Sequence, residues 1–396
     1  MNNIIGVRSQ ESGVRSQESG VRSQESGVRP VVSFCIPVYN NAEAAQKIVN
    51  SLLVSDDTRF EVIVTDDAST DNAQEILSQI HDPRFRYYRN DKNLGPHKNW
   101  EHALELGKGV YLFLSMMRDR LYGDKITHLI EILERAHREN ITLLQDGYDT
   151  KHDYKVYEGI DAMIRFLKTW HPTATIFDGD IFHSIPNRTR YFEISDMYPE
   201  NYVRRDCLLK GKGASIVSGI YSREGDFYYR NSHSTVEYGG PVLDTYYAPR
   251  RGTIHTFELI DMVEVDLPGL FPEDGINRYF KGHITKLMRG VSIGWYTIGN
   301  IGSEYYGQPP IKVTMRDAFM NIIDAYHNTE AHLKEKGIFT PAKHRIMYIC
   351  MVKTMVRTFR YVIYMSVKRT AKKILTPLGI WKILHDIKHS RRKTQQ

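Results

Sequence analysis

The chain has 396 residues and a formal net charge of +6, so it can form more than one domain with a full hydrophobic core. Its three cysteines, Cys35, Cys207 and Cys350, are widely spaced. They indicate neither a disulfide framework nor a zinc site, and they predict a reducing, cytoplasmic location. The charge is unevenly placed, because fourteen Lys and Arg residues and a single acid follow Pro341. A basic C-terminal segment indicates an anionic surface as a partner.

The N-terminal segment is repetitive, since residues 6–26 contain Gly-Val-Arg-Ser-Gln-Glu-Ser three times. A seven-residue period is typical of a coiled coil, but one valine per copy cannot form a two-position apolar seam, and glycine disfavours helix. We therefore expect residues 1–29 to be a disordered, low-complexity segment, with folding starting near Pro30.

Two short apolar runs, residues 32–38 and 60–66, have a helical pattern between them. This arrangement predicts a βαβ unit in a parallel sheet. Ligands of such sheets bind at the carboxyl ends of the strands. The polar side chains that follow the two runs are those of Tyr39, Asn40, Asp66 and Asp67. No glycine-rich phosphate loop follows the first run, which argues against a Rossmann or P-loop cofactor site.

Further along the chain, strands alternate with helices before the pattern becomes helical. Strands are expected over residues 85–88, 109–115, 141–144, 171–177 and 214–217. Helices are expected between them, including 154–170 and 201–211, and then over 256–263, 275–288, 314–337 and 341–368. The fold class is therefore α/β, with a mainly parallel central sheet followed by a C-terminal α-helical region.

Two motifs, Pro37-Val38-Tyr39-Asn40 and Asp66-Asp67-Ala68-Ser69, resemble those of the family 2 glycosyltransferases. That resemblance implies the Rossmann-like A-type glycosyltransferase fold. It also implies that Tyr39 and Asp67 hold the base of a nucleoside diphosphate sugar, with Pro37, Asn40 and Asp66 in the same site. The alternative is a generic βαβ turn in which Asp66 or Ser69 caps the next helix.

A third stretch, residues 93–100, resembles the Asn-x-Gly-x-x-x-Asn-Trp loop of one subset of that family. The resemblance places this loop near the donor diphosphate. It implies that Asn93 and Gly95 belong to the binding site and that His97 and Lys98 neutralise phosphate charge. The alternative is a surface turn with a core tryptophan.

The family has an Asp-x-Asp motif after the fourth strand, whose carboxylates hold Mg²⁺ or Mn²⁺ on the donor diphosphate. Here the two acidic places fall on Met117 and Asp119, with Arg118 between them, so the first carboxylate is missing. A methionine cannot replace it for a hard cation. Three possibilities remain: Asp119 holds the metal with diphosphate and water oxygens, Arg118 and Arg120 replace its charge, or the site is catalytically weak.

The catalytic base of the family is an acid at the start of a helix in the acceptor half. Counting back from Gly211 places it on Glu200, beside Pro199. An inverting transfer needs such a carboxylate to deprotonate the acceptor hydroxyl. Helix N-termini favour acids in any case. Glu200 could therefore be a plain first-turn acid, and Asp196 is the other candidate base.

The expected organisation has four parts: a low-complexity repeat (1–29), a glycosyltransferase catalytic domain (30–250), a helical extension (251–340) and a basic amphipathic tail (341–396). The resemblance implies a hexosyltransferase-like, inverting enzyme. It would move a sugar from a nucleoside diphosphate sugar to a glycan or lipid-linked acceptor in surface polysaccharide or glycolipid assembly. The alternative, motivated by Met117, is an inactive family member that acts as a sugar-nucleotide sensor or membrane-associated scaffold.

The basic tail predicts peripheral contact with the anionic inner face of the cell membrane. Lys353, Arg357 and Arg360 interrupt its apolar residues too often for a membrane span. A helical cap with a solvated face is the alternative. Nucleic acid is not expected as a partner, because no recognition motif is present.

Overall fold

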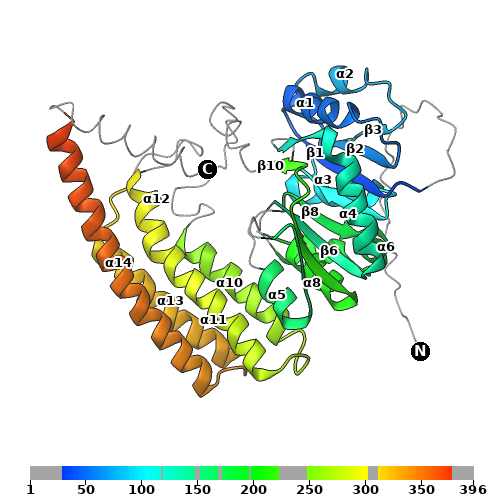
Figure 1. Cartoon of the computed structure of the whole chain (residues 1–396). Helices are drawn as coiled ribbons and strands as arrows, with labels where there is room; N and C mark the ends of the chain where they lie inside the picture. The colour runs from blue at the N-terminus through cyan, green and yellow to red at the C-terminus, as the bar shows by residue number, and fades with distance from the viewer. Residues whose placement is uncertain are drawn as a thin grey trace, which may run out of the picture. The chain divides into compact units, whose positions relative to one another are not determined.

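The computed structural model describes residues 29–116, 119–147, 152–167, 172–195, 198–222, 248–301 and 311–376. The repeat of residues 6–26, Met117, Arg118, Asp196 and the end of the basic tail lie outside these ranges. The chain divides into two compact units, residues 1–232 and 233–396 (Figure 1). The domain boundary expected at residue 250 stays a prediction, because residues 223–247 also lie outside the description.

The first unit is built on an eight-stranded sheet with the order β3-β2-β1-β4-β8-β6-β9-β7. Its strands are β1 (Val32–Val38), β2 (Phe60–Asp66), β3 (Phe85–Arg89), β4 (Tyr111–Leu114), β6 (Ile141–Asp146), β7 (Tyr154–Tyr157), β8 (Thr175–Asp178) and β9 (Lys212–Ile216). β8 runs antiparallel to β4 and β6, and β7 runs antiparallel to β9. The other neighbours are parallel, so the prediction of a mainly parallel sheet is confirmed.

Helices connect the strands of this sheet (Figure 1). They are α1 (Ala42–Leu53), α2 (Ala73–Leu77), α3 (Pro96–Leu106), α4 (Ile126–Arg138), α5 (Gly159–Phe166), α6 (Gly179–Ser184), α7 (Thr189–Ile194) and α8 (Glu200–Lys210). A short ribbon, β5 (Arg120–Leu121) with β10 (Tyr221–Ser222), lies outside the main sheet.

One predicted helix, over residues 154–170, is wrong in its first turn. Residues 154–157 form the edge strand β7, which pairs with β9 from Tyr154↔Ile216 to Tyr157↔Gly213. The segment Tyr-Lys-Val-Tyr consists largely of β-branched and aromatic residues, which favour a strand. The chain then turns through Gly159, whose φ of 50° favours glycine, and α5 follows.

The central strands are almost fully buried because helices cover both faces of a parallel sheet. Phe34 of β1 packs against Phe60 of β2 and Phe113 of β4, with ring centroids 5.9 Å and 5.2 Å apart. Helix α1 adds Ile48 and Leu52 to this core. The apolar runs read from the sequence therefore form the centre of the molecule's first unit.

The sheet has a topological switch point between β1 and β4. The chain winds outward from β1 to β2 and β3, and then returns to the other side of β1 as β4. The β1–β4 pairing ends at Cys35↔Leu114, whereas the β1–β2 pairing continues to Val38↔Asp66. Pro37 lies just beyond the last β1–β4 pair, where its missing N–H leaves no gap in the ladder. Ligands of open α/β sheets bind at such a switch point.

The second unit is helical, as predicted. Its helices are α10 (Pro249–Glu264), α11 (Glu273–Arg289), α12 (Trp295–Ile301), α13 (Met315–Glu335) and α14 (Pro341–Leu375), with a five-residue π-helix η4 (Gly290–Gly294) between α11 and α12. Its core includes Phe280, Ile284, Ile322 and Met347. Within the described residues, no helix has the length and apolar character needed to cross a membrane.

Candidate active site at the carboxyl edge of the sheet

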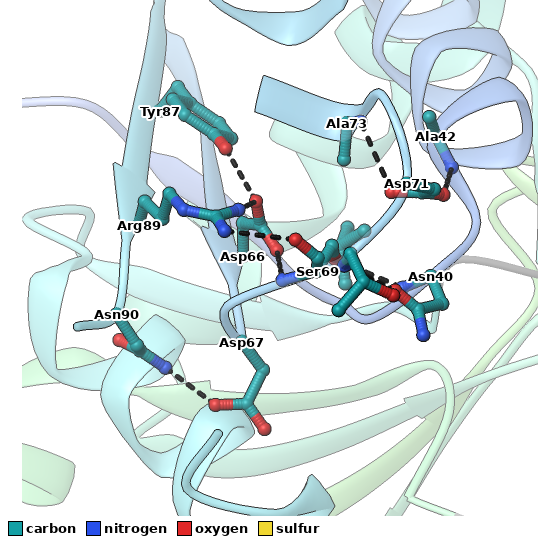
Figure 2. Close-up of polar contacts among 12 residues, drawn as sticks. Asn40, Ala42, Asp66, Asp67, Ser69, Asp71, Ala73, Tyr87, Arg89 and Asn90 are labelled. Atoms are coloured by element: carbon teal, nitrogen blue, oxygen red, sulfur yellow. Dashed lines mark hydrogen bonds and ion pairs between the residues drawn. The ribbon is translucent and has the colours of Figure 1, made fainter. Parts of the chain in front are cut away.

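The loops that follow β1 and β2 are joined by side-chain hydrogen bonds (Figure 2). Asn40, with a φ of 48°, donates its backbone N–H to Ser69 Oγ at 3.0 Å. Its Oδ1 accepts from the backbone N–H of Thr70 at 2.7 Å. Asp71 accepts from the backbone N–H groups of Ala42 and Ala73, and so it holds the starts of α1 and α2. Asn40 therefore has a clear structural role in fixing the two loops.

Asp66, at the end of β2, is fully buried and surrounded by donors. It accepts from Tyr87 Oη at 2.6 Å, from Arg89 Nη1 at 2.5 Å and from the Ser69 backbone N–H at 2.9 Å (Figure 2). The ion pair with Arg89 balances a charge that would otherwise be costly to bury. These bonds hold the loop after β2 in place, and none of them caps helix α2.

Asp67 is also buried, at 2 % exposure, but its contacts differ. Its Oδ1 accepts from Asn90 Nδ2 at 2.9 Å and from the Leu94 backbone N–H at 2.7 Å. Its Oδ2 accepts from the Gly95 backbone N–H at 2.9 Å. Asp67 therefore shapes the Asn93–Gly95 loop. Since each carboxylate oxygen can accept two hydrogen bonds, the geometry of Oδ2 is compatible with one further donor from a ligand.

Tyr39 immediately follows β1 and is 42 % exposed. The carbonyl oxygen of its neighbour Val38 accepts a hydrogen bond from the backbone N–H of Asp67 at 2.9 Å. Tyr39 and Asp67 therefore lie on adjoining loops, after β1 and β2 respectively. An exposed aromatic residue and a buried carboxylate on adjoining loops suit a planar ligand that carries an N–H group.

A buried amide pair, Asn90 and Asn99, extends this network and was not among the candidates from sequence. Asn99 donates to the carbonyl oxygens of Val38 at 3.3 Å and Thr65 at 3.0 Å, and so it joins the ends of β1 and β2. Asn90 donates to Asn99 Oδ1 at 3.1 Å. Asn99 belongs to the Asn-Trp dipeptide of the third motif, so a sequence signal for it existed.

The third motif forms the turn into α3. Gly95 has a φ of 83°, and its N–H also contacts Asn93 Oδ1 at 2.9 Å. His97 lies in the first turn of α3, with its ring centroid 5.4 Å from that of Trp100, and Lys98 is exposed. The N-terminus of an eleven-residue helix and an exposed lysine form an environment suited to an anion.

Asp119 lies beyond the end of β4, on the other side of the switch point from Tyr39. Its Oδ2 accepts from the Met116 backbone N–H at 2.7 Å and from Ser115 Oγ at 3.2 Å. Desolvation in this crowded edge nevertheless raises the pKa of Asp119 to about 7, although hydrogen bonds, including one from Thr173, oppose the shift. Among the residues described, no cluster of three or more His, Cys, Asp or Glu is placed to hold a metal.

Asp146, at the end of β6, is a second buried carboxylate that the sequence did not single out. It accepts from the Ser218 backbone N–H at 2.9 Å and from Ser218 Oγ at 2.5 Å. Burial raises the pKa of Asp146 to about 6. These bonds anchor the segment that leads into β10, which pairs with β5 at Arg120. Asp146 therefore holds the segment that pairs with Arg120, the residue after Asp119.

Glu200 is the first residue of α8 and is 2 % exposed. Because α8 precedes β9 and runs back against it, its N-terminus lies at the carboxyl edge. One turn later, the buried Arg204 donates to Thr175 Oγ1 at 2.6 Å and to Asn201 Oδ1 at 3.3 Å. The structure thus places Tyr39, Asp67, Asp119 and Glu200 at one edge of the sheet. Asp196 and Arg118 lie outside the described residues.

Comparison with known proteins identifies the class of this domain. Residues 33–205 match the family model described as Glycosyl transferase family 2, so the chain carries a domain of that glycosyltransferase family, as its motifs predicted. The matched range includes Tyr39, Asp67, Asp119 and Glu200.

Individual relatives agree with this class. The chain is similar to abequosyltransferase RfbV of Salmonella typhimurium, with 31% identity over 111 residues, 26% of this chain and 33% of that protein. It is also similar to the succinoglycan biosynthesis protein ExoO of Rhizobium meliloti, with 28% identity over 107 residues, 27% of this chain and 31% of that protein. The chain spans about a third or less of the length of the first curated relatives it matches.

Among solved structures, the crystal structure of residues 1–349 of Staphylococcus aureus TarS has a related fold. The TM-score is 0.51 at 13% sequence identity, and the match covers 86% of this chain and 91% of that one. At this identity the likeness concerns the fold alone. It supports the A-type glycosyltransferase architecture predicted from the sequence.

Proposed function

We propose that the protein transfers a sugar from a nucleoside diphosphate sugar to an acceptor hydroxyl, with inversion at the anomeric carbon. The observation that carries the proposal is the convergence of Tyr39, Asp67, Asp119 and Glu200 on one sheet edge within a family 2 domain. The base would stack on Tyr39 and donate a ring N–H to Asp67 Oδ2. The diphosphate would lie near the start of α3, with Lys98 and the exposed Arg120 as cations.

Glu200 is the proposed catalytic base. As the acceptor oxygen attacks the anomeric carbon, its proton passes to the Glu200 carboxylate. The bond from the anomeric carbon to the phosphate oxygen breaks on the opposite side, and the nucleoside diphosphate leaves with that electron pair. Its place as the first residue of α8 puts the carboxylate at the carboxyl edge of the sheet.

Asp119 suits a divalent cation such as Mg²⁺ or Mn²⁺. It is the carboxylate at the place of the second family acid, and burial raises its pKa to about 7, so a bound cation would stabilise its ionised form. One carboxylate with diphosphate and water oxygens can complete the shell of such an ion. When bound, the ion would stabilise negative charge on the leaving diphosphate. Asp119 would hold it, while Ser115 and the Met116 N–H orient the carboxylate.

We further propose a glycan or lipid-linked acceptor in surface polysaccharide or glycolipid assembly, at the anionic inner face of the cell membrane. The names of the relatives RfbV and ExoO support this class of product, and the basic C-terminal segment supports the location.

The test is release of nucleoside diphosphate from a panel of sugar nucleotides, with and without Mn²⁺, by the full chain. We expect Glu200→Gln and Asp119→Asn to lower kcat about 100-fold or more. The control variant Glu75→Gln changes an exposed acid on α2 and should stay within about twofold. Nucleotide-sugar binding without turnover, with membrane extract supplied as acceptor, would instead identify an inactive sensor or scaffold, the alternative that Met117 motivates.

A further inference from the structure

Helix α14 has a long apolar stripe on the side opposite to its packed face. The packed face contains Met347, Cys350, Thr354, Thr358 and Val362, which are all at most 9 % exposed and recur every three or four residues. The exposed stripe follows the same helical period on the other side. It comprises Ile349, Val352, Val356, Phe359, Ile363 and Val367, each between 36 % and 63 % exposed. We call this set the outer stripe.

The outer stripe is long for an exposed apolar surface. From Ile349 to Val367 it spans nineteen residues, or about 27 Å of helix. Exposed Tyr348 and Tyr364 lie beside it, and Ile374 continues it by two turns. Scattered apolar residues need no explanation on a protein surface, but a contiguous row of this length usually marks an interaction site.

Cations border the outer stripe on one side. Lys353, Arg357, Arg360 and Lys368 each follow a stripe residue by one position, which places them about 100° further round the helix. All four are exposed. The whole of α14, residues 341–375, contains no Asp or Glu. An apolar face with a purely cationic border is the pattern of a helix that lies in a membrane interface.

We propose that the outer stripe docks on an anionic lipid bilayer, with α14 lying in the plane of the interface. The aliphatic and aromatic side chains would enter the acyl boundary, while the lysine and arginine heads contact lipid phosphates. The helix does not satisfy the requirements for crossing the bilayer. The inference rests on the membrane partner proposed above, and it assigns that partner to one helix face.

Two other occupants fit the charge pattern less well. A second copy paired through the same face would bring Arg357 and Arg360 close to like charges, with no acid on either α14 to balance them. A nucleic acid would balance the cations, but its phosphates would leave Val356 and Phe359 without an apolar partner. A bilayer with anionic headgroups offers an apolar partner for the outer stripe and phosphate groups for the cations that border it.

The experiment is sedimentation of the full chain with vesicles of phosphatidylcholine, alone or mixed with phosphatidylglycerol. We expect binding to the mixed vesicles at low salt. The double variant Val356→Glu/Phe359→Glu should lose at least about 30-fold in partition, because a charge at the interface core opposes insertion. The control variant Leu270→Glu/Met320→Glu makes the same change at exposed apolar residues of the same unit, and should bind like the wild type.

A second variant, which removes charge only, measures the electrostatic contribution to vesicle binding. Arg357→Gln/Arg360→Gln should lower partition about fivefold for each cation removed, and only in vesicles that contain phosphatidylglycerol. Added salt should abolish the difference between this variant and the wild type.

The proposal would be overturned by equal sedimentation of Val356→Glu/Phe359→Glu and the wild type. It would also be overturned if the wild type formed a stable oligomer in light scattering that the double variant converted to monomer, or if the double variant lost poly-uridine binding but not vesicle binding. Nucleotide release from free sugar nucleotides, measured on the same samples, reports the proposed transferase activity separately. Vesicle binding can therefore fail while that activity stands, and the reverse.

Discussion

The buried carboxylates on the two sides of the switch point differ in their bonding partners and in the effect of burial on their pKa. On the β2 side, Asp66 is paired with Arg89, and Asp67 accepts three hydrogen bonds from the chain. On the β4 and β6 side, burial raises the pKa of Asp119 to about 7 and of Asp146 to about 6. On the first side, side chains and backbone groups of the protein itself bind both carboxylates, and the exposed Tyr39 follows β1 there. On the second side burial outweighs the hydrogen bonds that these carboxylates accept, so a cationic ligand there would stabilise their ionised form.

The strongest test of this difference is the buried pair on the β2 side. Asp66→Ala should lower the free energy of unfolding by about 3–5 kcal/mol, because Arg89 and Tyr87 lose their shared acceptor. Urea unfolding followed by circular dichroism measures it. Asp56→Ala, at an exposed acid of the same unit, should change it by less than about 0.5 kcal/mol. Unchanged stability combined with lost nucleotide binding would make Asp66 a ligand group instead.

The second test is the pH dependence that Asp146 contributes. Its folded pKa, about 6, lies above the usual value near 3.9, so between these values the folded state holds a proton that the unfolded state has lost. Stability from this group is therefore present at low pH and is lost as pH rises through that window.

Asp146→Asn cannot titrate, so its destabilisation relative to the wild type should shrink by up to about 3 kcal/mol between pH 4 and pH 7. Urea unfolding at both pH values measures this change. A difference that stays constant across the window would show that folding does not raise the pKa of Asp146, and would contradict this part of the comparison.

The third test concerns the exposed aromatic side chain. Tyr39→Ala should weaken binding of a nucleoside diphosphate by about 1–3 kcal/mol, the range for stacking of a base on an aromatic ring. Because Tyr39 is 42 % exposed, stability should change little. Calorimetric titration with UDP and GDP measures the affinity. Tyr39→Phe keeps the ring and should bind nearly as well, so equal losses in both variants would contradict a stacking role.

Sequence patterns predicted the strands and loops on the β2 side of the switch point, because local motifs form that side. The Tyr39 and Asp67 motifs follow buried apolar strands, so both the strands and the loops could be placed before the structure. Asp146 and Asn90 could not, since each is a single polar residue whose partners are 72 and 9 or more positions away. The edge strand β7 was also missed, because its pairing with β9 decides its conformation and local pattern does not.

The last test concerns Asp119 and the cation proposed for it. Metal ligands must be deprotonated, so a carboxylate with a pKa of about 7 should make Mn²⁺ affinity fall about tenfold for each pH unit below 7. Calorimetry with Mn²⁺ in the presence of UDP measures the slope between pH 5 and pH 7. Asp119→Asn should bind more weakly and show no slope from this group. If the two proteins had the same slope, the pH dependence would belong to the diphosphate, and the charge on the donor phosphates would have to be balanced by Arg118 and Arg120, the neighbours of Asp119 in the sequence.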